Sequence, residues 1–145
     1  MKIFILTDFE ELSLADIAGS KKVGSGILEV DLAEEKIQSL LNHGQSFKNL
    51  ILSLGKGTQP DSIKISSLKD FLWDGAKFKV EVKGVKGNEN RIEISKIIGK
   101  KIFSEIPTLK LDYKKPEVSI LVYFDGKKYF LGVGLGELNR RDYRI

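Results

Sequence analysis

The sequence of 145 residues predicts an α+β fold in two parts, an N-terminal ferredoxin-like domain and an α/β domain that ends in a β-hairpin. Three patterns support this prediction. Residues 1–57 alternate short apolar runs with two helix-capping patterns, residues 77–83 alternate charged and apolar side chains, and two apolar runs flank Asp125-Gly126. Because strands repeat every second residue and helices every three to four, these patterns distinguish the two kinds of element.

The N-terminal domain, residues 1–57, is predicted from the order of its elements. KIFIL predicts a strand, and Thr7 followed by Glu10 has the spacing of a capping box that opens a helix. KKVGSGILEV predicts two short strands, Asp31 with Glu34 opens a second helix, and FKNLILSLGKG predicts a last strand. The order strand, helix, strand, strand, helix, strand is that of a ferredoxin-like sandwich.

The second domain is predicted over residues 58–136. Gly, Pro and Asp at 55–61 indicate a connection. Ser67 then caps a short helix that reaches Trp73, which we expect to be a packing anchor. After the strand at 77–83, isoleucines recur at helical spacing and predict a helix that ends before a proline. These isoleucines are Ile94, Ile97, Ile98, Ile102 and Ile106, ahead of Pro107. Asp125-Gly126 predicts the turn of the final hairpin.

The stretch from Phe78 to Val133 resembles the THUMP domain of tRNA-modifying enzymes. The resemblance rests on a basic strand, an isoleucine-rich helix after a short polar loop, the link LKLDYKKPEV and a terminal hairpin that ends in glycine. It implies RNA binding, because THUMP domains that follow a ferredoxin-like domain grip the acceptor stem and 3′ end of tRNA. The tail ELNRRDYR resembles the segment that leads to the catalytic domain of THUMP-containing RNA methyltransferases, so we expect residues 137–145 to be a basic linker toward a missing catalytic domain.

Charge supports an RNA-binding second half. Residues 1–60 carry 6 Lys and no Arg against 8 acidic residues, whereas residues 61–145 carry 18 Lys plus Arg against 12. Basic surfaces attract RNA because each neutralised phosphate releases counterions, although a solubilising lysine-rich surface would have the same composition. The candidate RNA-binding residues are Lys79, Lys83, Lys86, Arg91, Lys100, Lys101, Lys127, Lys128, Arg140 and Arg141. Arg91 is the strongest candidate, because it precedes the predicted helix and its guanidinium can bond phosphate bidentately.

The sequence offers no catalytic centre and no metal site. The absence of cysteine and the single histidine, His43, exclude thiolate nucleophiles, cysteine zinc sites and histidine pairs. SLGKGT lacks the first glycine and the final Ser or Thr of a Walker loop. The start MKIFILTDFEEL reaches acidic residues too early for a signal peptide, and no run is long enough for a membrane span, so we expect a cytoplasmic protein.

The predicted function is therefore tRNA binding within a tRNA-modifying enzyme, most simply an RNA methyltransferase, with no cofactor in this chain and S-adenosylmethionine in the missing domain. One alternative is a standalone THUMP adaptor that delivers tRNA to a separate enzyme such as an acetyltransferase; the gene downstream of Ile145 would separate the two. Another alternative is a small enzyme whose cofactor is held by the glycine-rich stretch at Gly132, Gly134 and Gly136. A cofactor loop needs a following helix, so we interpret these glycines as the end of a strand.

Overall fold

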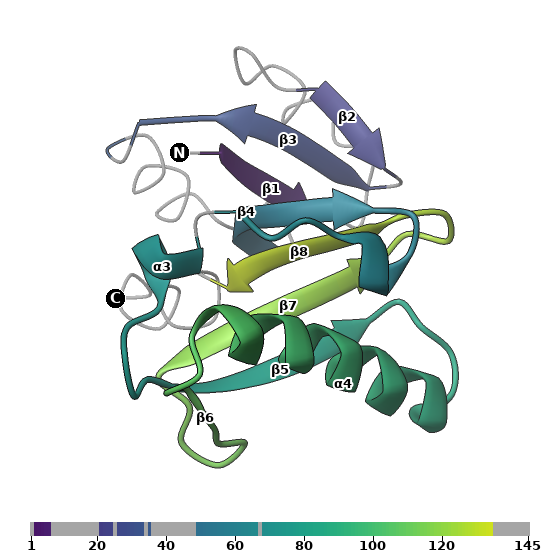
Figure 1. Cartoon of the computed structure of the whole chain (residues 1–145). Coiled ribbons are helices and arrows are strands. Elements are labelled where there is room, and N and C mark those ends of the chain that lie inside the picture. The colour runs from purple at the N-terminus through teal and green to yellow at the C-terminus, as the bar shows by residue number, and fades with distance from the viewer. Residues whose placement is uncertain are drawn as a thin grey trace. The chain divides into compact units, whose positions relative to one another are not determined.

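The computed structural model describes residues 2–6, 21–24, 26–33, 35, 49–66 and 68–134 of the chain (Figure 1). It confirms the predicted mixture of helices and strands. The chain divides into two compact units, of which the first comprises residues 1–53 and 134–145 and the second residues 54–133. None of the helices in the described ranges is both long and apolar enough to cross a membrane.

The N-terminal part of the chain contains the four strands that the sequence predicts, of which the last continues into the second unit: β1 (Lys2–Leu6), β2 (Lys21–Gly24), β3 (Ile27–Asp31) and β4 (Asn49–Gly57). Their order is β2-β3-β1-β4, and neighbouring strands run antiparallel. This is the strand order of a ferredoxin-like sheet. The two predicted helices, between β1 and β2 and between β3 and β4, lie outside the described residues apart from the start of the second, residues 31–33 and Glu35, where its predicted N-cap Asp31 is the last residue of β3. The ferredoxin-like domain therefore stays a prediction.

Strand β4 reaches Gly57, as FKNLILSLGKG predicts, and so includes the first residues of the connection that the sequence also predicts at Gly55–Asp61. The segment that follows returns close to the strand. The amide of Ser66 donates to the carbonyl of Leu54 at 2.9 Å. A Cβ atom at Gly55 would lie only 2.6 Å from the carbonyl oxygen of Lys64. Glycine at this position thus permits a close approach between two extended segments, not a turn.

The second unit contains the 3₁₀ helix η1 (Pro60–Ser62), α3 (Leu68–Phe71), β5 (Lys77–Lys83), α4 (Asn88–Glu105), β6 (Lys110–Leu111), β7 (Val118–Phe124) and β8 (Tyr129–Gly134). Its strands lie in the order β8-β7-β5-β6. β5 is parallel to both of its neighbours, and β7 and β8 form the predicted antiparallel hairpin. Helix α4 lies along one face of these strands (Figure 1).

Helix α4 packs through the predicted isoleucine stripe. Ile94, Ile98 and Ile102 are buried, and the ring of Phe103 meets the buried ring of Phe78 edge-on with centroids 5.4 Å apart. The helix ends at Glu105, before the proline, as predicted. Burial of these side chains fixes α4 over β5, which positions the loop and groove described below.

Trp73 is 51% exposed, so the prediction that it anchors the packing is wrong. Helix α3 is a single turn that ends at Phe71, and the buried side chains around it are Leu68 and Leu72. The chain then turns at Gly75, whose φ is +80°. Two leucines four positions apart already fill the inner side of one helical turn, which leaves the tryptophan outside.

Candidate nucleic-acid interface

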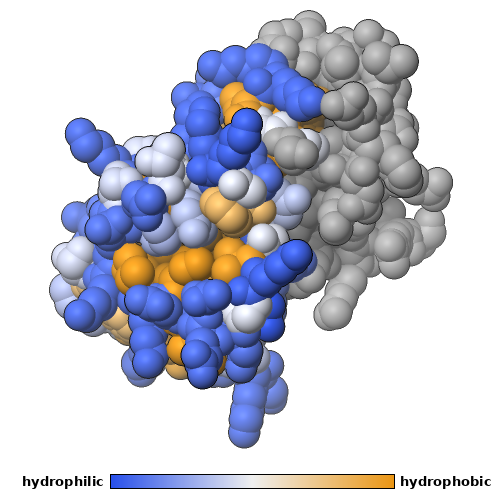
Figure 2. Space-filling view, turned by 90° about the vertical axis from the view of Figure 1, so that its right-hand side faces the viewer, coloured by the Kyte–Doolittle hydropathy of each residue, from blue (hydrophilic) through white to orange (hydrophobic). Residues whose placement is uncertain are grey.

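Strands β5 and β7 finish at the same end of the second unit (Figure 1), and four candidate lysines belong to the segments that meet there. Parallel strands carry their C-terminal ends to the same edge, and Lys83 of β5 is in register with Tyr123 of β7. The loop after β5 therefore lies beside the β7–β8 hairpin. We call the four exposed lysines of this end the basic edge; they are Lys83, Lys86, Lys127 and Lys128. The side of the molecule seen in Figure 2 carries mainly hydrophilic side chains around smaller apolar patches.

The hairpin that presents two of these lysines is fixed by a carboxylate. Asp125 Oδ1 accepts the amides of Lys127 and Lys128 at 2.8 and 2.7 Å, and the Asp125 amide donates to the Lys128 carbonyl at 3.1 Å. Gly126 has a φ of +103°, as the sequence predicts for this turn. Because the backbone is held by these bonds, the two lysine side chains extend from a defined turn.

The loop after β5 approaches the end of β7 at Gly84. This residue has a φ of +82°, and a Cβ atom there would lie 2.1 Å from the carbonyl oxygen of Phe124. No side chain fits in that space. The glycine therefore allows the loop that carries Lys86 to lie against the start of the hairpin.

Arg91 lies inside the first turn of α4, whereas the sequence places it just ahead of the helix. Its Nη1 donates to the carbonyl of Val85 at 3.0 Å, and its side chain is half-buried. The helix begins at Asn88, ahead of the position expected from the sequence, with Gly87 (φ +92°) as its N-cap. Arg91 thus secures the basic loop and retains other N–H groups for a ligand.

Two other candidates have structural partners, and a third has none among the residues that the structure describes. Lys79 forms an ion pair with Glu81 on the same strand. Lys101 Nζ donates to the carbonyl of Ile63 at 2.8 Å, which ties helix α4 to the segment after β4. Lys100 is exposed, on α4 and away from the basic edge. Arg140 and Arg141 lie outside the described residues.

We expect Lys101→Met to lower the free energy of unfolding by about 1 kcal/mol, because the Ile63 carbonyl loses a charged donor. Methionine keeps most of the aliphatic side chain. Lys100→Met is the matched control, since it removes the neighbouring exposed charge and no hydrogen bond within the described residues. Urea denaturation of the full chain measures both; equal midpoints for the two variants would contradict the structural role of Lys101.

A second lysine pair, absent from the predicted contacts, lies in the turn between β6 and β7. Asp112 Oδ1 accepts the amides of Lys114 and Lys115 at 2.9 and 3.0 Å, and both lysines are exposed. The amides of Lys115 and Lys114 hold the pKa of the Asp112 carboxyl below its usual value. The signal was available in the sequence, because DYKK repeats the Asp-x-Lys-Lys spacing of DGKK at the hairpin.

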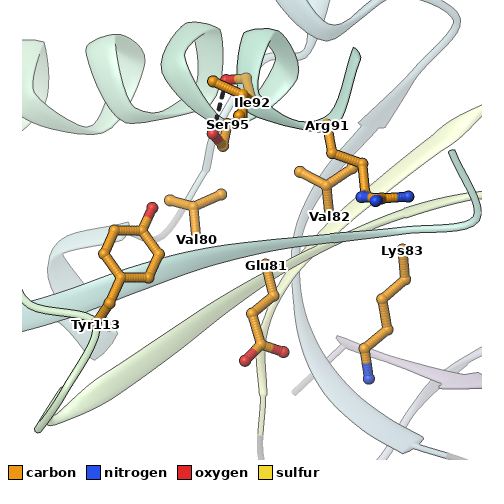
Figure 3. Close-up of a pocket in the computed structure, with 8 residues that line it drawn as sticks. All are labelled: Val80, Glu81, Val82, Lys83, Arg91, Ile92, Ser95 and Tyr113. Atoms are coloured by element: carbon orange, nitrogen blue, oxygen red, sulfur yellow. Dashed lines mark hydrogen bonds between the residues drawn. The ribbon is translucent and has the colours of Figure 1, made fainter. Parts of the chain in front are cut away.

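A groove of about 380 Å³ opens between α4 and the outer edge of β5, which is the edge that faces β6 and not β7 (Figure 3). Figure 3 shows Val80 and Val82 directed toward α4, with Arg91 at one end and Tyr113 at the other. Ser95 also lines it, with its hydroxyl bonded to a carbonyl of its own helix at 2.7 Å. We call this the β5 groove. The sequence could not predict it, since it depends on how far β6 extends along β5.

Two of the three glycines of the alternative cofactor site lie in a strand, and the third, Gly136, lies outside the described residues. Gly132 and Gly134 belong to β8, and Gly132 is in register with Leu121 of β7. A paired strand does not offer the free amides that hold a nucleotide or methyl donor. Within the described ranges, no three His, Asp or Glu side chains gather as a metal site.

Comparison with known families identifies the second unit. The THUMP domain family matches residues 65–133, which make up most of this unit. No curated protein matches the chain. The fold is shared with TrmN from Thermus thermophilus at 21% identity and a TM-score of 0.58, over 94% of this chain and 46% of that one.

Two further solved structures share the fold. One is a 4-thiouridine synthetase–RNA complex with bound ATP, at 15% identity and a TM-score of 0.58, over 92% of this chain and 41% of that one. The other is a predicted N6-adenine-specific DNA methylase from Listeria monocytogenes, at 13% identity and a TM-score of 0.62, over 92% and 40% of the two chains. The present chain thus spans less than half the length of these three proteins.

Proposed function

We propose that this chain is the tRNA-binding part of a tRNA-modifying enzyme, an RNA methyltransferase acting in the cytoplasm, and that it recognises the acceptor stem and 3′ end of tRNA. The observation that carries the proposal is the basic edge in the part of the chain that matches the THUMP family, where the end of β5 with its following loop and the β7–β8 hairpin present four exposed lysines together. Spaced cations on a rigid surface suit the phosphates of an RNA duplex, which is recognised mostly by shape.

The relatives support the enzymatic part of the proposal. One neighbour in fold is a thiouridine synthetase in complex with RNA, and another is a putative methyltransferase complexed with SAH. In this proposal residues 1–57 form a ferredoxin-like domain, residues 58–136 the THUMP domain and residues 137–145 a linker to a catalytic domain. S-adenosylmethionine would bind that catalytic domain and supply the methyl group. The residues described for this chain would hold only the RNA.

Fluorescence anisotropy tests the proposal with three ligands: an intact tRNA, the same tRNA trimmed of its single-stranded 3′ end, and a DNA duplex of similar length. We expect the intact tRNA to bind most tightly and the logarithm of its affinity to fall linearly with the logarithm of the salt concentration. Four phosphate contacts predict a slope of about −3, since each contributes about 0.7 to 0.9. A flat salt response, or equal affinity for tRNA and DNA, would contradict the proposal.

A further inference from the structure

The outer edge of β5 is open over its second half. β6 pairs with β5 only at Lys77 and Phe78, and the last backbone bond along this edge joins the Asp112 amide to the Phe78 carbonyl at 2.9 Å. Successive residues of a strand direct their backbone groups to opposite edges, so Val80 and Val82 direct theirs to the same edge as Phe78, past the end of β6. Within residues 68–134, these groups have no strand partner there and face the β5 groove.

Large apolar side chains stand on two sides of the β5 groove. Tyr113, from the β6–β7 turn, is 59% exposed, and Ile92, from α4, is 46% exposed. They are two of the four large hydrophobic side chains that the described part of the chain leaves exposed. Between them lie the side chains of Val80 and Val82. An exposed aromatic and aliphatic pair beside unpaired backbone groups is the composition of a binding site for a flat ligand with polar edges.

Positive charge lies at both ends of the β5 groove. Arg91 lines the end near Val82, and Lys114 and Lys115 follow Tyr113 directly in a turn that Asp112 holds. One acidic residue, Glu81, also lines the groove; its side chain is directed away from α4 (Figure 3), and its charge is paired with Lys79. A ligand with a flat central part and negative groups on either side complements this arrangement.

We propose that the β5 groove binds one unpaired nucleotide of an RNA strand. The base stacks on the Tyr113 ring and its edge bonds to the backbone groups of Val80 and Val82, while the flanking phosphates lie near Arg91 and the Lys114–Lys115 pair. This inference rests on the proposed RNA-binding function and adds a contact that reads single-stranded RNA. An extended peptide is a poorer occupant, because two outward-facing residues offer less than the usual strand length for pairing.

Substitution of Tyr113 tests the stacking contact in the full chain. The two probes are an RNA duplex with a short single-stranded extension and the same duplex with blunt ends. We expect Tyr113→Ala to weaken binding of the extended RNA about tenfold or more and to change binding of the blunt duplex by less than about twofold. Tyr113→Phe should bind both RNAs like the original chain, because the ring is retained.

Trp73→Ala is the matched control, because it removes an equally exposed aromatic side chain that does not line the groove. It should affect both RNAs equally. If Tyr113→Ala weakens both RNAs to the same extent, or Trp73→Ala reproduces its selective effect, the nucleotide site is overturned, while the basic edge can still carry RNA binding. If the original chain binds neither RNA, the proposed function itself fails.

Two measurements on the unaltered chain avoid any effect of substitution on folding. A 5-iodouridine placed in the extension should cross-link to Tyr113 on irradiation, as mapped by mass spectrometry, and cross-linking only elsewhere would overturn the inference. Hydrogen exchange of the Val80 and Val82 amides should slow with the extended RNA and not with the blunt duplex. If the exchange of these amides slows with rising protein concentration in the absence of RNA, a second copy of the chain adds a strand to β5, and this result would also overturn the nucleotide site.

Discussion

Replacement of the four lysines of the basic edge by glutamine is expected to weaken tRNA binding about 100-fold or more at about 0.1 M salt. The four side chains are exposed and belong to two adjacent loops, so one duplex backbone can meet all of them. Glutamine keeps a polar side chain of similar length and removes only the charge. The slope of log affinity against log salt should become less negative by about 3, because about 0.7 to 0.9 is lost with each phosphate contact.

The control removes the same amount of charge from elsewhere in the second unit. Four other exposed lysines are replaced by glutamine, namely Lys64, Lys69, Lys77 and Lys96. Because both variants have the same net charge, a general electrostatic attraction would weaken them equally. We expect the control to lose far less affinity and to keep most of its salt slope. Equal losses in anisotropy titrations would show that the basic edge is not the RNA-binding surface.

Gly84→Ala is expected to lower the free energy of unfolding by about 2 to 4 kcal/mol. Two costs combine at this position. A φ of +82° strains any residue with a Cβ atom, and that atom would lie 2.1 Å from the Phe124 carbonyl oxygen, so the loop or the end of β7 must shift. The shift would also move Lys86 away from the hairpin. Urea denaturation and the anisotropy titration measure the two effects.

Gly75→Ala separates the two costs. Gly75 has nearly the same φ, +80°, and no atom lies within 4 Å of its Cβ position. It should therefore lose only the conformational part, about 1 kcal/mol, and leave tRNA affinity unchanged. If both alanine variants are destabilised equally, the close approach of Gly84 to Phe124 contributes nothing to stability.

The elements with strong local signals were predictable from the sequence. Helix α4 follows from its isoleucine spacing and from Pro107, and the final hairpin follows from Asp125-Gly126. Trp73 was placed wrongly because a pattern shows that a residue is apolar but not whether an inner position remains for it. A four-residue helix has room inside for little more than Leu68 and its neighbour one turn later.

The site was predictable only in part, because its geometry depends on distant contacts. The lysines of the basic edge could be named from charge, but Lys101 finds its partner 38 positions away in the chain, at Ile63. The β5 groove exists because β6 stops after two residues, and no composition marks that end. Arg91 was expected to face a ligand freely, yet one of its donors is used by the Val85 carbonyl.

The two Asp-x-Lys-Lys turns bear on how such a protein can change over generations. In each turn the carboxylate of Asp112 or Asp125 accepts two main-chain amides, and these bonds hold the turn without using the charge of a lysine side chain. Mutation can therefore add or remove single charges at these sites with little effect on stability. The affinity for nucleic acid can therefore change in small steps during evolution, provided that the two aspartates are retained.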